Sequence, residues 1–203
     1  MSWVLHNLNR TLNWRDFPHR KLPPPKVGED ADAAETKARV EYSYTLTPLR
    51  NARPVRQQLS DIRVNILFSR DESWVASWAL GLPHDEQVAL LSHEQGHYDL
   101  TALLGRDFFL AVWDLRSKTY ASDSEFKSDL DNLTEAYLDK GRPVTDKYDD
   151  DTRHGLDKNK QSNWRGFINK ARTSPQTPPQ RGPDGSSRML RILDVLDKGG
   201  IAI

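Results

Sequence analysis

The stretch from Pro83 to about Leu115 constrains the fold of this chain more than any other part of the sequence. A break at Gly81-Leu82-Pro83 precedes it, Pro83 suits a first helical position, and Asp85 with Glu86 suits a first turn. The apolar residues that then recur at helical spacing are Val88, Leu91, Leu100, Leu103, Leu104, Phe108 and Ala111. This pattern predicts one long helix.

The segments before this helix alternate as strands do. Apolar or aromatic residues alternate with polar or small ones along Lys37–Thr47 and again along Ile62–Phe68, which predicts two half-buried strands. The Pro-rich stretch Lys21–Asp30 is predicted as a loop, because proline cannot join the ladder of a sheet. A further strand is expected near the N-terminus, in the region bounded by Trp3 and Trp14.

Two more helices are expected after the long one. A helix over Ser122–Lys140 begins at a capping box that Glu125 completes, and Gly141 would stop it. The polar stretch Lys147–Lys158 is predicted as a loop, and Ser162–Ala171 as the third helix.

These elements predict an α+β fold in which a small N-terminal β-sheet packs against the long helix and two further helices complete the core. Composition divides the chain into a domain over residues 1–172 and a Pro/Gly-rich linker with a C-terminal tail over residues 173–203. The last part of the tail, MLRILDVLDKGGIAI, is expected to form a short amphipathic helix.

Composition also narrows the function classes. The chain has 29 Lys+Arg and 29 Asp+Glu, and this zero net charge argues against a general nucleic-acid binder. No apolar run is long enough to predict a membrane span. The N-terminus lacks the pattern of a signal peptide, which predicts a cytoplasmic protein, with a periplasmic or secreted location as the alternative. Cysteine is absent, so any metal must be bound by His, Asp or Glu.

The pentapeptide His93-Glu94-Gln95-Gly96-His97 lies inside the predicted long helix. Residues i and i+4 lie one above the other on a helix, so both imidazoles can reach one ion, and zinc accepts His nitrogens at about 2.0–2.1 Å. Glu94 projects to the same rim, where it can take a proton from a water held by the metal during attack on a carbonyl. The apolar flanks favour a metal site over coincidence, because burying unliganded histidines and a glutamate is costly.

A catalytic zinc ion usually has a third protein ligand. An extension of the motif along the same helix is excluded, because Leu100 and Leu103 stand where its Gly and its ligand would be. His154, followed by Gly155, is the first candidate for the third ligand, and Glu135 is the alternative. A His154 that only hydrogen-bonds its acidic neighbours is the non-functional interpretation.

Residues next to His154 in the sequence could support the chemistry. Tyr148 or Arg153 could stabilise the oxyanion that forms when water adds to a peptide carbonyl, whereas simple packing and solvation are the alternatives. One carboxylate of Asp149–Asp151 could orient His154 by accepting its free ring proton.

Several of these segments together resemble the bacterial family called domain of unknown function 922, whose members are described as predicted secreted Zn-dependent proteases. The matching segments, which span all but the tail, are Leu12–Phe17, Ser73–Val75, His93–Asp99, Tyr148–Gly155, and Gln161 with Trp164. The resemblance implies a zincin-like metallopeptidase that binds one Zn²⁺ through His93, His97 and His154, with Glu94 as the base.

The sequence therefore predicts a zinc metallopeptidase that acts on a peptide or protein substrate. A zinc hydrolase of another amide, such as a cell-wall crosslink, is one alternative. A catalytically silent interaction module is the other. The oligomeric state is not indicated by any of these patterns.

Overall fold

The computed structural model describes residues 3–24, 32–50, 52, 54–173 and 190–203. Its strands are β1 (Trp3–His6), β2 (His19–Arg20), β3 (Ala34–Glu35), β4 (Ala38–Pro48), β5 (Gln57–Phe68) and β6 (Trp74–Ala76). Its main helices are α1 (His84–Asp114), α2 (Asp123–Leu133), α3 (Gly141–Thr152), α4 (Lys158–Arg172) and α5 (Ile192–Lys198). Single helical turns lie at Trp14–Asp16, Ala79–Gly81 and Leu115–Ser117.

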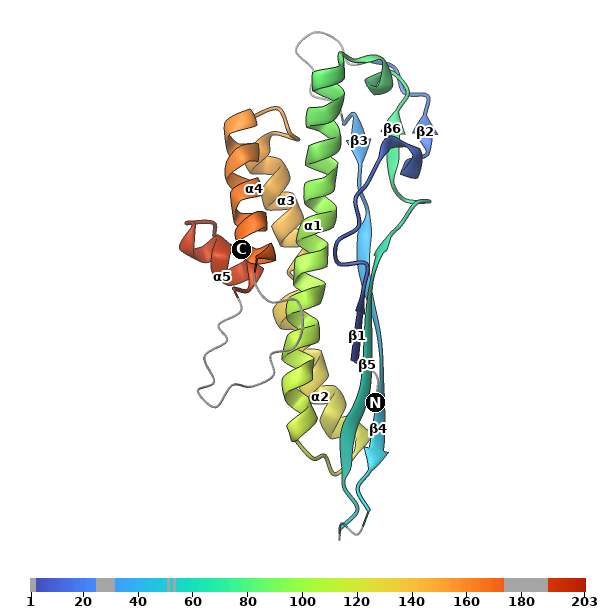
Figure 1. Cartoon of the computed structure of the whole chain (residues 1–203), viewed down its shortest axis with the longest axis vertical. Helices are drawn as coiled ribbons and strands as arrows, with labels where there is room; N and C mark the ends of the chain where they lie inside the picture. Colours follow the sequence, from blue (N-terminus) through green and yellow to red (C-terminus); the bar gives the residue numbers. More distant parts are fainter. Residues whose placement is uncertain (1–2, 25–31, 51, 53, 174–189) are drawn as a thin grey trace.

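The long helix α1 lies at the centre of the molecule, with the strands on one side and α3, α4 and α5 on the other (Figure 1). This arrangement confirms both the long helix and the α+β class. From Leu100 to Val112 only Thr101 is not fully buried, because side chains from both layers cover the helix. A helix covered on two sides needs apolar residues around its whole circumference, which explains the dense run of Leu and Phe in this part of the sequence.

The strands form two small sheets. In the first, with the order β1-β5-β4, the long strands β4 and β5 pair antiparallel and β1 joins β5 in parallel. In the second, β6 lies between β2 and β3. The two predicted strands are confirmed, although β5 begins at Gln57, five residues before the predicted start at Ile62. Because β3 and β4 each lie at the edge of a sheet, each has one side without a strand partner among the described residues.

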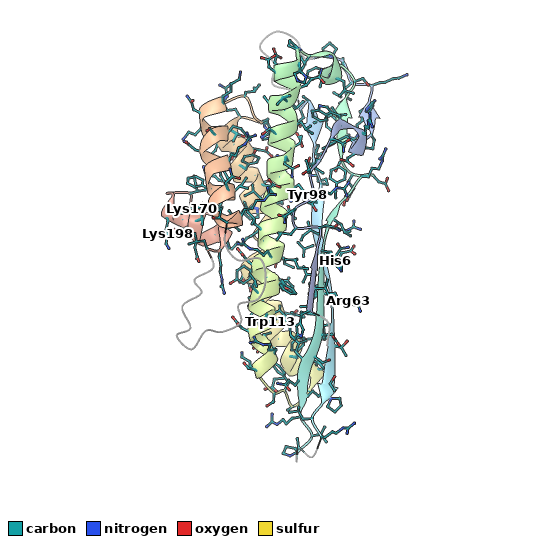
Figure 2. All side chains as sticks on the ribbon, viewed as in Figure 1. His6, Arg63, Tyr98, Trp113, Lys170 and Lys198 are labelled. Atoms are coloured by element: carbon teal, nitrogen blue, oxygen red, sulfur yellow. The ribbon has the colours of Figure 1, made fainter. Side chains whose placement is uncertain are left out.

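Aromatic side chains fasten α1 to the strands. Tyr98 points from α1 toward the strands, and its hydroxyl donates to the carbonyl of Asn7 at 2.6 Å (Figure 2). Near the far end of the helix, the ring of Trp113 meets that of Trp3 edge to face at 4.4 Å. These two contacts hold α1 against both ends of strand β1.

The region after α1 differs from its prediction. Ser122 caps α2 as expected, but α2 passes into a π-helical stretch at Thr134–Leu138. The predicted loop over Lys147–Lys158 is wrong for its first half, because α3 begins at Gly141 and continues to Thr152, and only residues 153–157 form a loop before α4. The physical reason is that the side chains of α3 that face inward, Val144, Tyr148 and Thr152, are buried at helical spacing, while none of its Asp and Lys residues is fully buried.

The short C-terminal helix expected from the sequence is present as α5, and its apolar side chains pack against α1 and α4. Residues 174–189 of the predicted linker lie outside the described residues. Two fully buried charged residues of α1 connect it to its neighbours: Arg106 donates to the carbonyls of Ala171 and Leu190, and Asp107 accepts from the backbone nitrogen of Ile192. None of the described helices combines the length and apolar character that crossing a membrane requires.

Candidate metal centre

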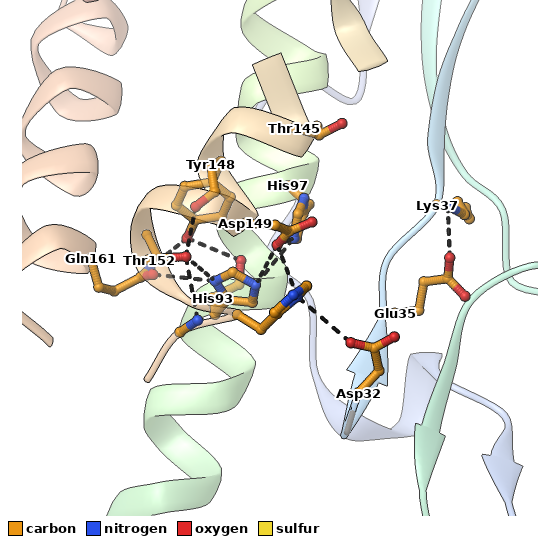
Figure 3. Close-up of polar contacts among 12 residues, drawn as sticks. Asp32, Glu35, Lys37, His93, His97, Thr145, Tyr148, Asp149, Thr152 and Gln161 are labelled. Carbon is orange, nitrogen blue, oxygen red and sulfur yellow. Dashed lines mark hydrogen bonds and ion pairs between the residues drawn. The ribbon is translucent and has the colours of Figure 1, made fainter. Parts of the chain in front are cut away.

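Two histidines from adjacent turns of α1 meet a carboxylate from α3. Asp149 Oδ1 lies 3.0 Å from His93 Nε2 and 2.9 Å from His97 Nε2, and the two Nε2 atoms are 3.2 Å apart (Figure 3). The three residues each offer one ligand atom, and these atoms all lie within 4.8 Å of one another. Such a His-His-Asp group could hold one metal ion, and two imidazoles with a carboxylate suit zinc as well as other divalent ions.

The three residues interact strongly. Burial opposes a charge on Asp149, but hydrogen bonds from His93 and His97 outweigh it and hold the pKa of the carboxyl well below its usual range. Burial likewise opposes protonation of His93, but the hydrogen bond to Asp149 and the charges of Glu94 and Asp149 raise its pKa. The carboxylate is therefore ionised at neutral pH and available as an anionic ligand.

Glu94 lies beside this group on α1 and is almost completely buried, with 2% of its surface exposed. Its Oε2 atom has no hydrogen-bond partner among the described residues. Burial raises the pKa of this carboxyl, against the opposing charges of His97 and His93 and the nearby Thr36 hydroxyl, which also lies outside hydrogen-bonding geometry. A buried carboxyl oxygen without a partner is costly for a fold, and its place beside possible metal ligands makes Glu94 a candidate functional residue.

The donor atoms face a cleft of about 1390 Å³. The edge of the strand layer, Ala33–Val40, lines one wall, and α1 contributes His93, Glu94 and His97 to its floor. The opposite wall includes Thr145 and Asp149 of α3. The candidate metal centre is thus open to a ligand as large as a peptide segment.

His154, the predicted third ligand, lies at the rim of this cleft with 57% of its side chain exposed. Its Nδ1 is 3.7 Å from Asp149 Oδ1 and 3.6 Å from Asp32 Oδ1. The chain turns sharply here, because Arg153, His154 and Gly155 all adopt left-handed backbone conformations. His154 therefore lies near His93, His97 and Asp149, but its Nδ1 is farther from Asp149 Oδ1 than the Nε2 atoms of the other two histidines are. Its role as a ligand stays a prediction. The alternative, Glu135, is exposed on the π-helical stretch.

Tyr148, predicted to stabilise an oxyanion, is fully buried against His93. The two rings stack with their centroids 4.8 Å apart, and the Tyr148 hydroxyl donates to the His93 carbonyl at 3.3 Å. This close contact requires Gly96, because a Cβ atom at that position would overlap the Tyr148 hydroxyl. Arg153, the other candidate, is exposed at the C-terminus of α3.

Sequence reasoning missed Asp149 as a candidate ligand and considered it only as a partner of His154. The predicted loop concealed it, since helical spacing would have placed Tyr148 and Thr152 on one face with Asp149 beside them. Gln161, which contacts His93, was noted only as part of the family resemblance. The helix predicted over Ser162–Ala171 corresponds to α4, but no sequence signal shows that it packs where Gln161 reaches the histidine.

Comparisons with known proteins add no relative to this description. No family model matches the chain, and neither the curated proteins nor the solved structures contain a match.

Proposed function

We propose that the protein is a zinc-dependent metallopeptidase. The observation that carries the proposal is the buried Glu94 carboxyl, which has an unpartnered oxygen beside three convergent donor atoms at the floor of an open cleft. Two imidazoles and a carboxylate are a donor set of catalytic zinc. The resemblance of His93–Asp99 and Tyr148–Gly155 to the domain of unknown function 922 family supports the same class.

His93, His97 and Asp149 would hold the ion, and His154 is the alternative third ligand. When bound, zinc supplies a Lewis acid that polarises the substrate carbonyl and makes a water more acidic. Glu94 takes the proton of the attacking water and passes it to the leaving nitrogen. A pKa raised by burial suits a carboxyl that must carry this proton between the two steps.

The wall of the cleft favours an extended substrate. Residues Ala34–Lys37 line it, and the edge positions of β3 and β4 leave backbone groups that a peptide could pair with as an added strand. This mode of binding recognises the backbone of a chain rather than one small molecule. It favours a peptide or protein over a compact amide substrate.

The test uses purified protein loaded with one equivalent of Zn²⁺ and a mixed peptide library, with cleavage products identified by mass spectrometry. The proposal expects cleavage that a chelator abolishes and that added Zn²⁺ restores. Purified cell-wall fragments are assayed in parallel. Cleavage of these fragments alone would replace the peptidase proposal by the other amide hydrolase, and zinc binding without any turnover would overturn both.

A further inference from the structure

Gln161, on α4, reaches the side of the His93 ring that faces away from Asp149. Its Oε1 atom lies 3.2 Å from His93 Nδ1, and its Nε2 atom contacts the hydroxyl of Tyr148 (Figure 3). One amide thus connects three helices at a point directly behind a candidate metal ligand.

The direction of each hydrogen bond in this group follows from a single fixed acceptor. The backbone carbonyl of His93 can only accept, so the Tyr148 hydroxyl 3.3 Å away donates its proton there. The hydroxyl must then accept from the amide nitrogen of Gln161. This leaves the amide oxygen toward His93 Nδ1, and because that oxygen can only accept, Nδ1 carries a proton.

Thr152 leads to the same assignment independently. Its hydroxyl donates to the carbonyl of Tyr148 at 2.7 Å, so its lone pairs are free to accept. They face the backbone nitrogen of Gly155 at 3.3 Å and His93 Nδ1 at 3.5 Å. Both acceptors around Nδ1 therefore call for a proton on that atom.

Packing holds the ring in the matching orientation. Tyr148 stacks on one face of His93 with an interplanar angle of 17°. Gly155 also lies against His93, so closely that a Cβ atom on it would be 2.9 Å from the Cβ of His93. The Asp149 carboxylate, 3.0 Å from His93 Nε2, accepts a proton from that atom. A bound metal ion would replace this proton, so a ring that is held in place and keeps its proton on Nδ1 would present the lone pair of Nε2 to the ion.

We propose that Gln161 is a positioning residue that fixes the ring tautomer of His93 and thereby presents Nε2 as the metal-binding atom. The inference rests on the metal centre proposed above and adds a residue outside the ligand set and the base. Loss of such an outer contact typically weakens metal affinity by about 10- to 100-fold. The same loss is expected here when the amide oxygen is removed.

The first test measures the Zn²⁺ affinity of the full chain by competition with a chromogenic chelator, so it requires no substrate. Gln161→Leu removes the acceptor and is expected to weaken binding by about 10- to 100-fold. Gln161→Glu keeps an oxygen that accepts from Nδ1 and is expected to retain affinity within a few-fold of the wild type. Asn163→Ala, an exposed change on the same helix, is the matched control and should leave affinity unchanged.

A wild type and a Gln161→Leu variant with equal affinity would overturn the role of Gln161 and leave the peptidase proposal intact. A wild-type protein that binds no zinc would overturn both. A second measurement needs no variant: long-range ¹H–¹⁵N spectra of the zinc-loaded wild type identify the protonated ring nitrogen. The proposal expects a protonated Nδ1 and a metal-bound Nε2 for His93, and coordination through Nδ1 would contradict it.

Discussion

Both halves of α1 contain buried ionisable side chains, but these side chains differ in whether their polar atoms have hydrogen-bond partners. In the C-terminal half, Arg106 donates to Asp107 and to two backbone carbonyls, and Asp107 also accepts from the backbone of α5. In the N-terminal half, Glu94 is as deeply buried, yet its Oε2 has no partner among the described residues and the residue lines a cleft. The comparison shows that buried ionisable side chains with full hydrogen bonding connect helices, whereas an unpartnered one that lines a cleft is a candidate for a functional role.

The largest effect is expected at Glu94. Glu94→Gln keeps the shape of the side chain but removes its capacity to accept a proton, so peptide hydrolysis should fall by about 10²- to 10⁴-fold. The zinc content should be unchanged, because the variant retains every donor atom of the metal group. Turnover of a cleaved library peptide and the metal-to-protein ratio together check this prediction.

Asp85→Asn is the control for Glu94→Gln, since it neutralises an exposed carboxylate on the first turn of the same helix. It should leave both turnover and zinc content at wild-type values. A fully active Glu94→Gln variant would exclude Glu94 as the base and remove the contrast between the two halves of α1.

The next effect is expected at Asp107 and concerns stability. Asp107→Ala leaves the buried guanidinium of Arg106 without its counter-charge, which should cost about 3–5 kcal/mol of the free energy of unfolding. Urea unfolding monitored by circular dichroism measures it. The double change Arg106→Met with Asp107→Leu removes both charges and should recover much of the loss. If Asp107→Ala lowers the free energy of unfolding by less than about 1 kcal/mol, the Arg106–Asp107 pair does not stabilise the packing of α1 as its contacts indicate.

A third prediction separates the candidate third ligands. Asp149→Ala removes a member of the tight donor group, so its zinc affinity should fall by more than the about 100-fold that loss of an outer contact can cost. His154→Ala changes a mostly exposed side chain at the rim and should weaken binding by no more than about 10-fold. The reverse order in a chelator competition would make His154 the third ligand.

The smallest effect is expected at an ion pair on the surface, between Lys118 and Asp129, which contrasts with the buried pair on α1. The Lys118 ammonium, 2.9 Å from Asp129, holds the pKa of that carboxyl below its usual value, against the opposing effect of burial. A lowered pKa adds stability at pH values above the unfolded pKa of about 3.9, and this stability is lost as the pH falls through the folded pKa. Asp129→Asn should therefore cost under about 1 kcal/mol at pH 7 and less at pH 3, measured by urea unfolding at both pH values. An equal cost at the two pH values would contradict the ion pair as its source.

The sequence predicted those parts of the molecule whose signals are local. Helix α1 and its His93 and His97 follow from spacing along one element, and β4 and β5 from alternation. Asp149 did not follow, because its position depends on how α3 packs against α1, and the Asp-rich composition of α3 is also typical of loops. The contact between Gln161 and His93 depends on yet another helix. Contacts of this kind arise from tertiary packing, which one sequence does not encode locally.

The close contact between Gly96 and Tyr148 has a consequence for how distant kin of this chain could be found. A side chain at position 96 would displace Tyr148 and with it the neighbouring Asp149. The glycine in the pentapeptide therefore depends on how α3, more than forty residues further along the chain, packs against α1. Any sequence built on this two-helix contact should read His-Glu-x-Gly-His and carry a Tyr-Asp pair downstream. A search that requires both features at once would recognise such kin even where overall similarity has vanished.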